Sequence, residues 1–213
     1  HTALAAELSD KQSRVAELSD IVDSVQAVQR RLAVSESQEA LESGVCEELL
    51  AMADIDFVWL GRPTGADTDL SAAAWAGDAG GYLDAVLGDA TGRGLPAQRA
   101  AATCQPFTVD HIPSRVFDDP WAKEAVSHEF KSAYSVPLVY DDVLYGVLTA
   151  YSRTESAFGE MYANLFADIA SLLVNYSRVL EQRQGGDGQL QTEAEFRIDD
   201  ATETLQRLAA ATD

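Results

Sequence analysis

The side chains of this sequence most able to carry metal, redox or acid–base chemistry are Cys46, Cys104, His111 and His128. The two cysteines lie far apart without CxxC spacing, so they match neither a zinc site nor a disulfide framework. The two histidines lack the neighbouring ligands of a metal triad. No GxSxG, HExxH or P-loop motif is present. These residues therefore predict a protein that is not an enzyme and holds no metal.

Each cysteine has its own interpretation. Cys46 shares an apolar helical face with Val45 and Leu49, which predicts a buried structural thiol. Cys104 lies just before a strand predicted at Phe107 and is the candidate for a redox-sensing thiol, a role that requires exposure and a lowered pKa. Because two cysteines without a pairing motif fit a reducing compartment, we expect a cytoplasmic protein.

The sequence is strongly acidic, with 35 Asp and Glu against 15 Lys and Arg, a net charge of −20 and a pI near 4.3. A surface this negative repels phosphate backbones, so we expect no direct binding of nucleic acid. We interpret the acidity as an adaptation to a halophilic cytoplasm, where salt screens the self-repulsion. The melting temperature should then rise between low and molar salt, and a constant value would contradict this interpretation. No segment approaches the roughly 20 uninterrupted apolar residues of a membrane span, so we expect no membrane partner.

The elements that must position these residues begin with one long helix over residues 1–34. Its apolar residues recur at spacings typical of a coiled-coil heptad and are Leu4, Leu8, Val15, Leu18, Val22, Val25 and Leu32. Lys11 and Gln29 interrupt this seam, which weakens pairing but fixes its register. We expect two chains to pair through this helix as a homodimer. An amphipathic helix packed on its own domain is the alternative.

The middle of the chain alternates between strand-like and helix-like segments. Ser35 to Gln38 resembles a capping box, which predicts a helix over residues 36–53. The segments with strand character are 57–60, 70–76, 107–112, 132–140 and 143–151. The segments with helical character between them are 82–87, 96–103 and 120–129. Asp141-Asp142 is expected to form the tight turn of the last hairpin, and the whole pattern predicts an α+β fold.

A second heptad stripe follows the hairpin, along a helix expected from Ser156 to Gln184. Its members are Phe158, Tyr162, Leu165, Ile169, Leu172, Tyr176 and Val179. Helices with such stripes at both ends of a domain can form a parallel bundle in a dimer, which transmits a shift between modules. We interpret residues 185–213 as a linker and the start of a following domain, with strand-like residues 193–199.

The hairpin carries a resemblance to a known family. Val136-Pro137-Leu138 followed by Tyr145-Gly146-Val147-Leu148 resembles the hairpin of a GAF domain. More narrowly, the chain is similar to GAF domains of the haloarchaeal bacterio-opsin activator family. The segments that carry this similarity are 40–50, 57–61, 74–77, 82–83, 120–121 and 132–151. Glu195 to Asp200 resembles the opening of the activator-specific region of that family.

This resemblance implies a GAF sensor domain over residues 35–184 of a transcription regulator. It implies a central antiparallel sheet of about six strands, flanking helices, and long N- and C-terminal helices that form a homodimer. The DNA-binding region would lie outside this sequence. GAF domains typically bind a small ligand between the sheet and its covering helices. The residues that the resemblance places around such a pocket are Trp59, Trp75, Tyr82, Phe107, His111, Trp121, Phe130, Ser132 and Tyr134.

Among these residues, Trp75 and Trp121 are the leading pocket candidates, although for any single aromatic residue ordinary core is the better interpretation. Aromatic walls with a few polar tips suit a flat, modestly polar ligand. The sequence names no cofactor, and it leaves open whether the signal is chemical, redox or light-derived.

The sequence also departs from several GAF types. It lacks the Asn-Lys…Phe…Asp-Glu signature of the cyclic-nucleotide-binding members, and no cysteine lies in a chromophore-attachment context. The GAF-fold methionine sulfoxide reductases use three cysteines, whereas this chain has two. Two other functions stay open at this point. One is a module that only dimerises and spaces its neighbours. The other is the sensor segment of a histidine kinase, against which residues 193–213 show no phosphoacceptor histidine.

Overall fold

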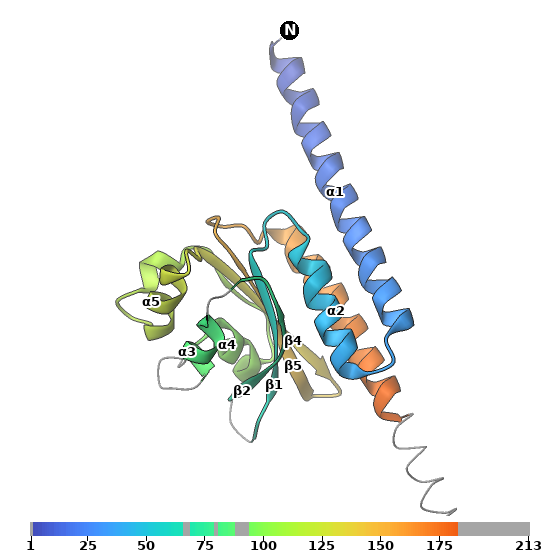
Figure 1. The fold of residues 1–213 in the computed structure, drawn as a ribbon. Coiled ribbons are helices and arrows are strands. Elements are labelled where there is room, and N and C mark those ends of the chain that lie inside the picture. The colour runs from blue at the N-terminus through green and yellow to red at the C-terminus, as the bar shows by residue number, and fades with distance from the viewer. Residues whose placement is uncertain (1, 66–68, 79–80, 88–93, 183–213) are drawn as a thin grey trace, which may run out of the picture. The chain divides into compact units, whose positions relative to one another are not determined.

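A computed structural model describes residues 2–65, 69–78, 81–87 and 94–182 (Figure 1). The chain divides into two units, residues 1–174 and residues 175–213. The fold and the candidate site described below lie within the first unit. The segment 185–213, interpreted above as a linker and the start of another domain, lies outside the described residues.

Two helices precede the sheet. α1 covers Thr2–Val34 and α2 covers Gln38–Leu50. The hydroxyl of Ser37 caps α2 by accepting a hydrogen bond from the Ala40 amide at 3.2 Å. The capping box predicted at Ser35 was wrong, because α1 continues to Val34. Ser35 instead donates its hydroxyl to the Arg31 carbonyl at 2.7 Å and so satisfies the C-terminal end of α1.

Five antiparallel strands form one sheet in the order β2-β1-β5-β4-β3. Their bounds are β1 Phe57–Pro63, β2 Leu70–Ala76, β3 Phe107–Val109, β4 Ser132–Tyr140 and β5 Val143–Ser152. The expectation of about six strands was one too high for the described residues. The segments 82–87 and 96–103 fold as helices over the sheet, and the predicted strand 107–112 stops at Val109. The chain then turns into the short 3₁₀ helix η2, Ile112–Arg115.

The β4–β5 hairpin follows its sequence signal closely. Asp141 and Asp142 both adopt left-handed backbone angles, with φ of 48° and 61°, as a tight hairpin turn requires. Pro137 lies in β4 beyond the stretch that β3 pairs with, Ala133 to Ser135, so its missing N–H costs that ladder no hydrogen bond.

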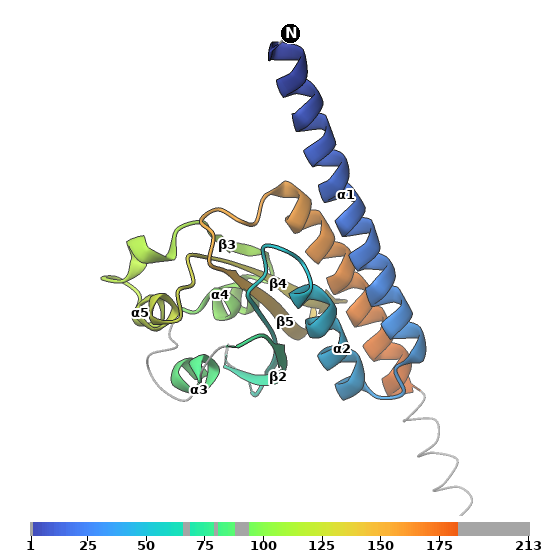
Figure 2. The same cartoon turned by 45° about the horizontal axis from the view of Figure 1, so that its top comes forward.

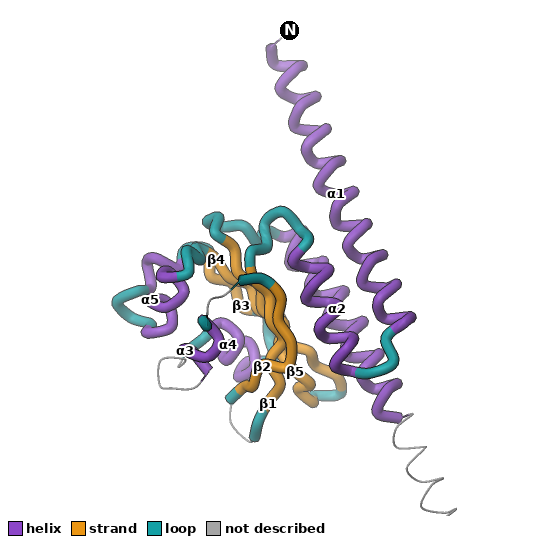
Figure 3. The backbone as a smooth tube through the Cα atoms, viewed as in Figure 1, coloured by secondary structure: helices purple, strands orange, loops and turns teal. Residues whose placement is uncertain are grey.

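Helices cover the sheet on both faces (Figures 1 and 3). On one face lie α2 and the final helix, of which residues 160–174 belong to the first unit. Figure 2 shows these two helices on the same side of the strands. On the other face lie α3 (Tyr82–Leu87), α4 (Pro96–Thr103) and α5 (Pro120–Ser127). We call these the α2 face and the α3–α5 face.

The alternation of side chains along each strand assigns residues to these faces. Phe57 and Trp59 of β1 stand opposite Tyr151 and Thr149 of β5, and all four point to the α3–α5 face. The intervening residues, including Leu148 of β5, point to the α2 face. Both faces are therefore buried, and β1 reads as a continuous apolar run rather than an alternating one.

Candidate functional site

The candidate site is a buried aromatic cluster on the α3–α5 face. The sheet contributes Phe57, Trp59 and Tyr151, and α3 contributes Tyr82. Trp121 comes from α5 and Phe130 from the segment just after it. All six side chains are fully buried. We call this set the aromatic cluster.

Four rings of the aromatic cluster, those of Phe57, Tyr82, Phe130 and Tyr151, pack closely against one another. The centroids of Phe130 and Tyr151 lie 5.0 Å apart, and those of Tyr82 and Tyr151 lie 5.3 Å apart. Phe57 stacks on Phe130 at 5.9 Å with an interplanar angle of 17°. These separations are those of favourable aromatic pairs, so the rings form flat, rigid walls inside the domain.

The covering helices bring small side chains over these rings. The alanines that α4 and α5 bury in this layer are Ala97, Ala100, Ala101, Ala122 and Ala125. Small residues leave the large rings of the sheet to fill the interior. Most of the volume and all the polar atoms at the centre of this layer therefore belong to aromatic residues, Ser135 and Thr149.

Two pairs of hydroxyl groups lie on the α3–α5 face of the sheet. The Tyr82 and Tyr151 hydroxyls are 3.0 Å apart, and those of Ser135 and Thr149 are 2.8 Å apart. Burial raises the pKa of Tyr82 well above its usual range, and the neighbouring Tyr151 adds to this rise. Burial also raises the pKa of Tyr151, while the Tyr82 hydroxyl and the Trp59 indole oppose the rise. Both phenols are therefore neutral donors at physiological pH.

Two buried indole N–H groups stand out within the described residues. Trp59 Nε1 and Trp121 Nε1 are inaccessible to solvent and form no hydrogen bond. Trp59 lies near enough to the Tyr151 hydroxyl to affect its pKa, but without the geometry of a hydrogen bond. Leaving a buried donor unsatisfied costs about 1–3 kcal/mol, so such groups are rare and call for an explanation.

The sequence model of the GAF domain matches residues 35–175, which is more than half of the chain. The chain belongs to the GAF domain family. This match covers α2, the whole sheet and the aromatic cluster. No curated protein matches the sequence.

Solved structures show the same fold. The free methionine-R-sulfoxide reductase of Neisseria meningitidis, solved with its substrate, is 20% identical with a TM-score of 0.59, covering 73% of this chain and 87% of that one. The GAF domain of the Acinetobacter phosphoenolpyruvate-protein phosphotransferase is 13% identical with a TM-score of 0.57, covering 79% and 97%. The chromophore-binding domain of a bacteriophytochrome from R. palustris is 17% identical with a TM-score of 0.57, covering 78% and 63%. At these identities the likeness establishes the GAF fold alone.

The structure brings several of the predicted pocket residues of this GAF domain together. Trp59, Tyr82, Trp121 and Phe130 all belong to the aromatic cluster. Phe107 packs against the edge of the cluster. The guanidinium groups of Arg99 and Arg115 lie over the Phe107 ring, at 5.5 and 5.9 Å from its centroid.

Four other predicted pocket residues lie elsewhere. Trp75 is the cross-strand partner of Trp59, but it lies on the edge strand β2 and its side chain is 58% exposed. Tyr134 points to the α2 face, where its ring packs edge-on against Phe166 at 5.4 Å.

Ser132 and His111 have local structural partners. The Ser132 hydroxyl donates to the Thr154 carbonyl at 2.7 Å. The ring of His111 caps η2, because its Nδ1 accepts a hydrogen bond from the Ser114 amide at 3.1 Å. Its Nε2 lies 3.3 Å from Glu155. Neither residue belongs to the aromatic cluster.

The sequence analysis missed Phe57, Ser135, Thr149 and Tyr151, which complete the polar and aromatic lining of this face. A signal for them existed, because Phe57 is two positions before Trp59 and Tyr151 is two positions after Thr149. Side chains at that spacing share one face of a strand. Using it required the pairing of β1 with β5, which the sequence did not provide.

The two cysteines occupy different environments, as their sequence contexts suggested. Cys46 is fully buried in α2, where desolvation and then the carboxylates of Glu42 and Glu47 raise its pKa to about 12. Cys104 is exposed at the C-terminal end of α4, in a left-handed backbone conformation with φ of 50°. Of the two thiols, only Cys104 is therefore accessible to an oxidant.

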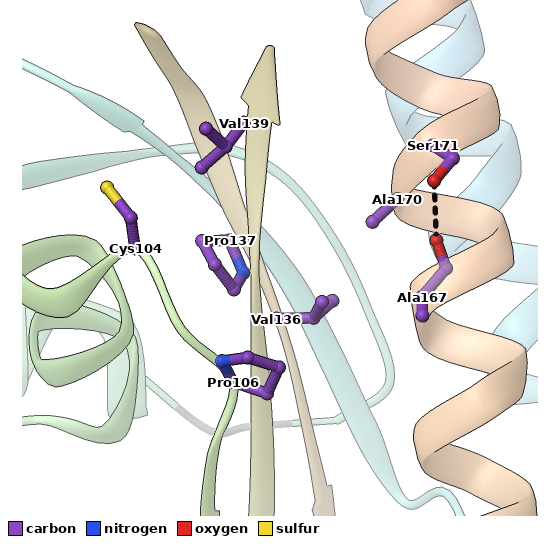
Figure 4. A pocket seen from close by; sticks show the side chains of 8 residues that line it. All are labelled: Cys104, Pro106, Val136, Pro137, Val139, Ala167, Ala170 and Ser171. Carbon is purple, nitrogen blue, oxygen red and sulfur yellow. Dashed lines mark hydrogen bonds between the residues drawn. The ribbon is translucent and has the colours of Figure 1, made fainter. Parts of the chain in front are cut away.

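Cys104 lines a shallow groove of about 190 Å³ at the outer edge of β4 (Figure 4). Pro106, Pro137 and Val139 line the groove on the strand side, and Ala170 and Ser171 line it from the final helix. The lining is mostly apolar and carries no charged side chain. Because β3 is only three residues long, the edge of β4 from Val136 onward forms one wall of this groove.

The structure also bears on metal binding and on membrane spanning. Among the described residues, no group of three or more His, Cys, Asp or Glu side chains is arranged to hold a metal ion. None of the described helices combines the length and apolar character needed to cross a membrane.

Proposed function

We propose that this GAF domain senses a small molecule on its α3–α5 face and passes its occupancy through dimeric helices to a regulatory region outside this sequence. The observation that carries the proposal is the pair of buried indole N–H groups without acceptors, Trp59 and Trp121, inside a cluster of rigid rings. A purely structural core gains nothing from such donors, whereas a ligand with an acceptor atom would satisfy them.

The outward-facing residues of α1 support a homodimer. Leu8, Val15 and Val22 recur every seven residues and are 57%, 66% and 52% exposed. Farther along the helix, Val28 is fully buried and Arg31 pairs with Glu48 of α2 at 2.8 Å. The C-terminal part of α1 is therefore held by its own domain, while an apolar stripe on the N-terminal part is free to pair with a second copy.

The resemblance to bacterio-opsin activators supports the further proposal that this sensor belongs to a transcription regulator of a halophilic cytoplasm. In that setting, DNA would be bound by a region other than this acidic one, whose net charge of −20 opposes contact with phosphates. The domain itself would bind its ligand without converting it. One supporting observation is that Cys46 is fully buried, which leaves Cys104 as the accessible thiol of the two.

Native mass spectrometry of the freshly purified chain tests both parts of the proposal, with the denatured mass as the control. We expect a dimer that carries additional non-covalent mass. Val15→Asp should convert it to a monomer, because a buried carboxylate at a helix seam is strongly unfavourable. Ser13→Asp adds the same charge on another side of α1 and should leave the dimer intact.

Each other outcome has a defined meaning. A dimer that stays empty in cell extract and after purification would support the spacer function and contradict sensing. A monomer in the wild-type chain would contradict transmission through paired helices. Reduction of free methionine-R-sulfoxide by the chain would show that the domain is an enzyme.

A further inference from the structure

Resting on the proposed sensing function, we propose a chemical class for the ligand: a flat, uncharged molecule bearing a carbonyl-type acceptor, bound by the indole N–H groups of Trp59 and Trp121. The first argument is the balance of donors and acceptors on the α3–α5 face. Its central polar groups are two indoles, which only donate, and four hydroxyls arranged in two pairs.

Within each hydroxyl pair one O–H donates to the other oxygen, which leaves the second O–H of the pair to find an acceptor of its own. The two indole N–H groups add two donors that no described residue accepts. Each hydroxyl oxygen also has lone pairs that can accept a hydrogen bond, so the donors of this face that lack an acceptor among the described residues are the two indole N–H groups. A ligand that contributes an acceptor oxygen or nitrogen would satisfy them.

The second argument is charge. Among the described residues, the buried charged side chain is Glu42, which lies on the α2 face. A charge that acts on the α3–α5 face is that of Glu124 of α5, which adds to the rise of the Tyr82 pKa that burial causes. Glu124 in turn lies 3.4 Å from His128, at the border of the cluster. An anionic ligand would lose its hydration without meeting a buried cation, so the acceptor must belong to a neutral group.

The third argument is shape. Phe57 and Phe130 stack nearly parallel, and the Phe130 and Tyr151 planes differ by 32°. Walls of this kind favour a planar molecule that can slide between rings and small side chains. Of the covering helices, α4 buries only proline and alanine side chains, so it can shift without withdrawing a large side chain from the core.

The test uses four probes of one shape but different chemistry, namely benzamide, benzoate, benzylamine and toluene. Each is titrated into the full ¹⁵N-labelled chain while the three indole Nε1–H resonances are followed by NMR. Trp75, whose side chain is 58% exposed, serves as the internal reference. We expect benzamide to shift the Trp59 and Trp121 resonances saturably without moving that of Trp75. Its Kd should be about tenfold lower than that of toluene, the size of one net hydrogen bond.

Single substitutions test whether the indole N–H groups themselves bind the probe. Trp121→Phe and Trp59→Phe each keep a ring but remove the N–H, so each should weaken benzamide binding about tenfold and toluene binding far less. Trp75→Phe is the matched control and should change neither affinity. Equal losses for both probes would show that the indoles act only as walls, and would overturn the inference.

The remaining outcomes separate this inference from the sensing function. Tighter binding of benzoate or benzylamine than of benzamide would refute a neutral acceptor but leave the site in place. Equal affinities for benzamide and toluene would show an apolar site without donor recognition. If no probe moves either buried indole up to its solubility limit, the ligand class is wrong. Sensing itself would still stand if the native dimer carries a bound mass.

Discussion

The two faces of the sheet are built from the same strands but differ in whether their buried polar groups are hydrogen-bonded. On the α2 face, Glu42 is the one carboxylate that is buried among the described residues, and it is fully paired, with Arg62 at 2.6 Å and Gln38 at 3.0 Å. On the α3–α5 face, Trp59 and Trp121 keep their N–H groups buried without partners. The α2 face thus follows the general rule that buried polar groups are hydrogen-bonded. The α3–α5 face instead bears the energetic cost of two buried N–H groups without partners, which packing does not explain.

This difference indicates where function resides in the fold. The α2 face joins the sheet to α2 and the final helix, so we expect it to be tightly packed. The α3–α5 face can tolerate incomplete hydrogen bonding if a ligand completes it. Sites of binding are expected where a protein departs from ideal packing and satisfaction of polar groups.

The sharpest test of the comparison uses two adjacent residues of β5. Leu148 points to the α2 face and Thr149 to the α3–α5 face, and both are fully buried. Leu148→Ala should lower the free energy of unfolding by about 2–5 kcal/mol, because it leaves a cavity in close-packed core. Thr149→Val keeps the volume, breaks one hydroxyl pair and should cost only about 1 kcal/mol. Urea denaturation of both variants measures this; a loss for Thr149→Val as large as that for Leu148→Ala would show that the hydroxyl pair contributes more than one net hydrogen bond.

Alkaline pH is expected to lower the free energy of unfolding through different titratable groups on the two faces. The pKa of Cys46 in α2 is raised from 9.0 to about 12, so the unfolded chain loses this proton first as the pH rises. The free energy of unfolding should be unaffected below pH 9 and then fall by about 1.4 kcal/mol per pH unit up to about pH 12. Cys46→Ala should remove this slope. Tyr82 and Tyr151, on the other face, contribute in the same direction only above pH ~10, their ordinary value.

The measurement is chemical denaturation of wild type and Cys46→Ala in parallel between pH 8 and pH 10. Identical pH dependence in the two proteins would show that the Cys46 thiol titrates normally and is not buried in solution. Cys104→Ala is the matched control, because that thiol is exposed and its removal should leave the slope unchanged.

The tyrosine pair is expected to give a smaller effect than Leu148→Ala. Tyr82→Phe or Tyr151→Phe removes the 3.0 Å hydrogen bond and isolates the remaining hydroxyl, at a cost of about 1–2 kcal/mol. The double variant removes both hydroxyls and should be less destabilised than the sum of the singles. A thermal or urea double-mutant cycle gives this coupling. Strict additivity would mean that the two hydroxyls do not interact.

A large part of the fold could be predicted from sequence. The turn at Asp141-Asp142 was confirmed, because two consecutive residues that tolerate positive φ between β-branched and aromatic runs favour a tight hairpin. The cap of α2 was misplaced by two residues, since Ser35 and Ser37 are both competent caps and only the end of α1 distinguishes them. Of the residues predicted to line a pocket, Trp59 and Trp121 lie together in the aromatic cluster, whereas Tyr134 and Trp75, which are also large aromatic residues, lie elsewhere.

The sequence by itself determined the local elements, the acidic charge and the GAF fold, because these depend on periodicity, turn chemistry and motif order along the chain. Tertiary structure decided which face each aromatic residue occupies. When both faces of a sheet are covered, strands become apolar throughout and alternation no longer distinguishes inside from outside. Only the pairing of β1 with β5 and of β5 with β4 brings Trp59, Tyr151 and Thr149 to one side. Only the packing of α5 buries the Trp121 indole on that same side.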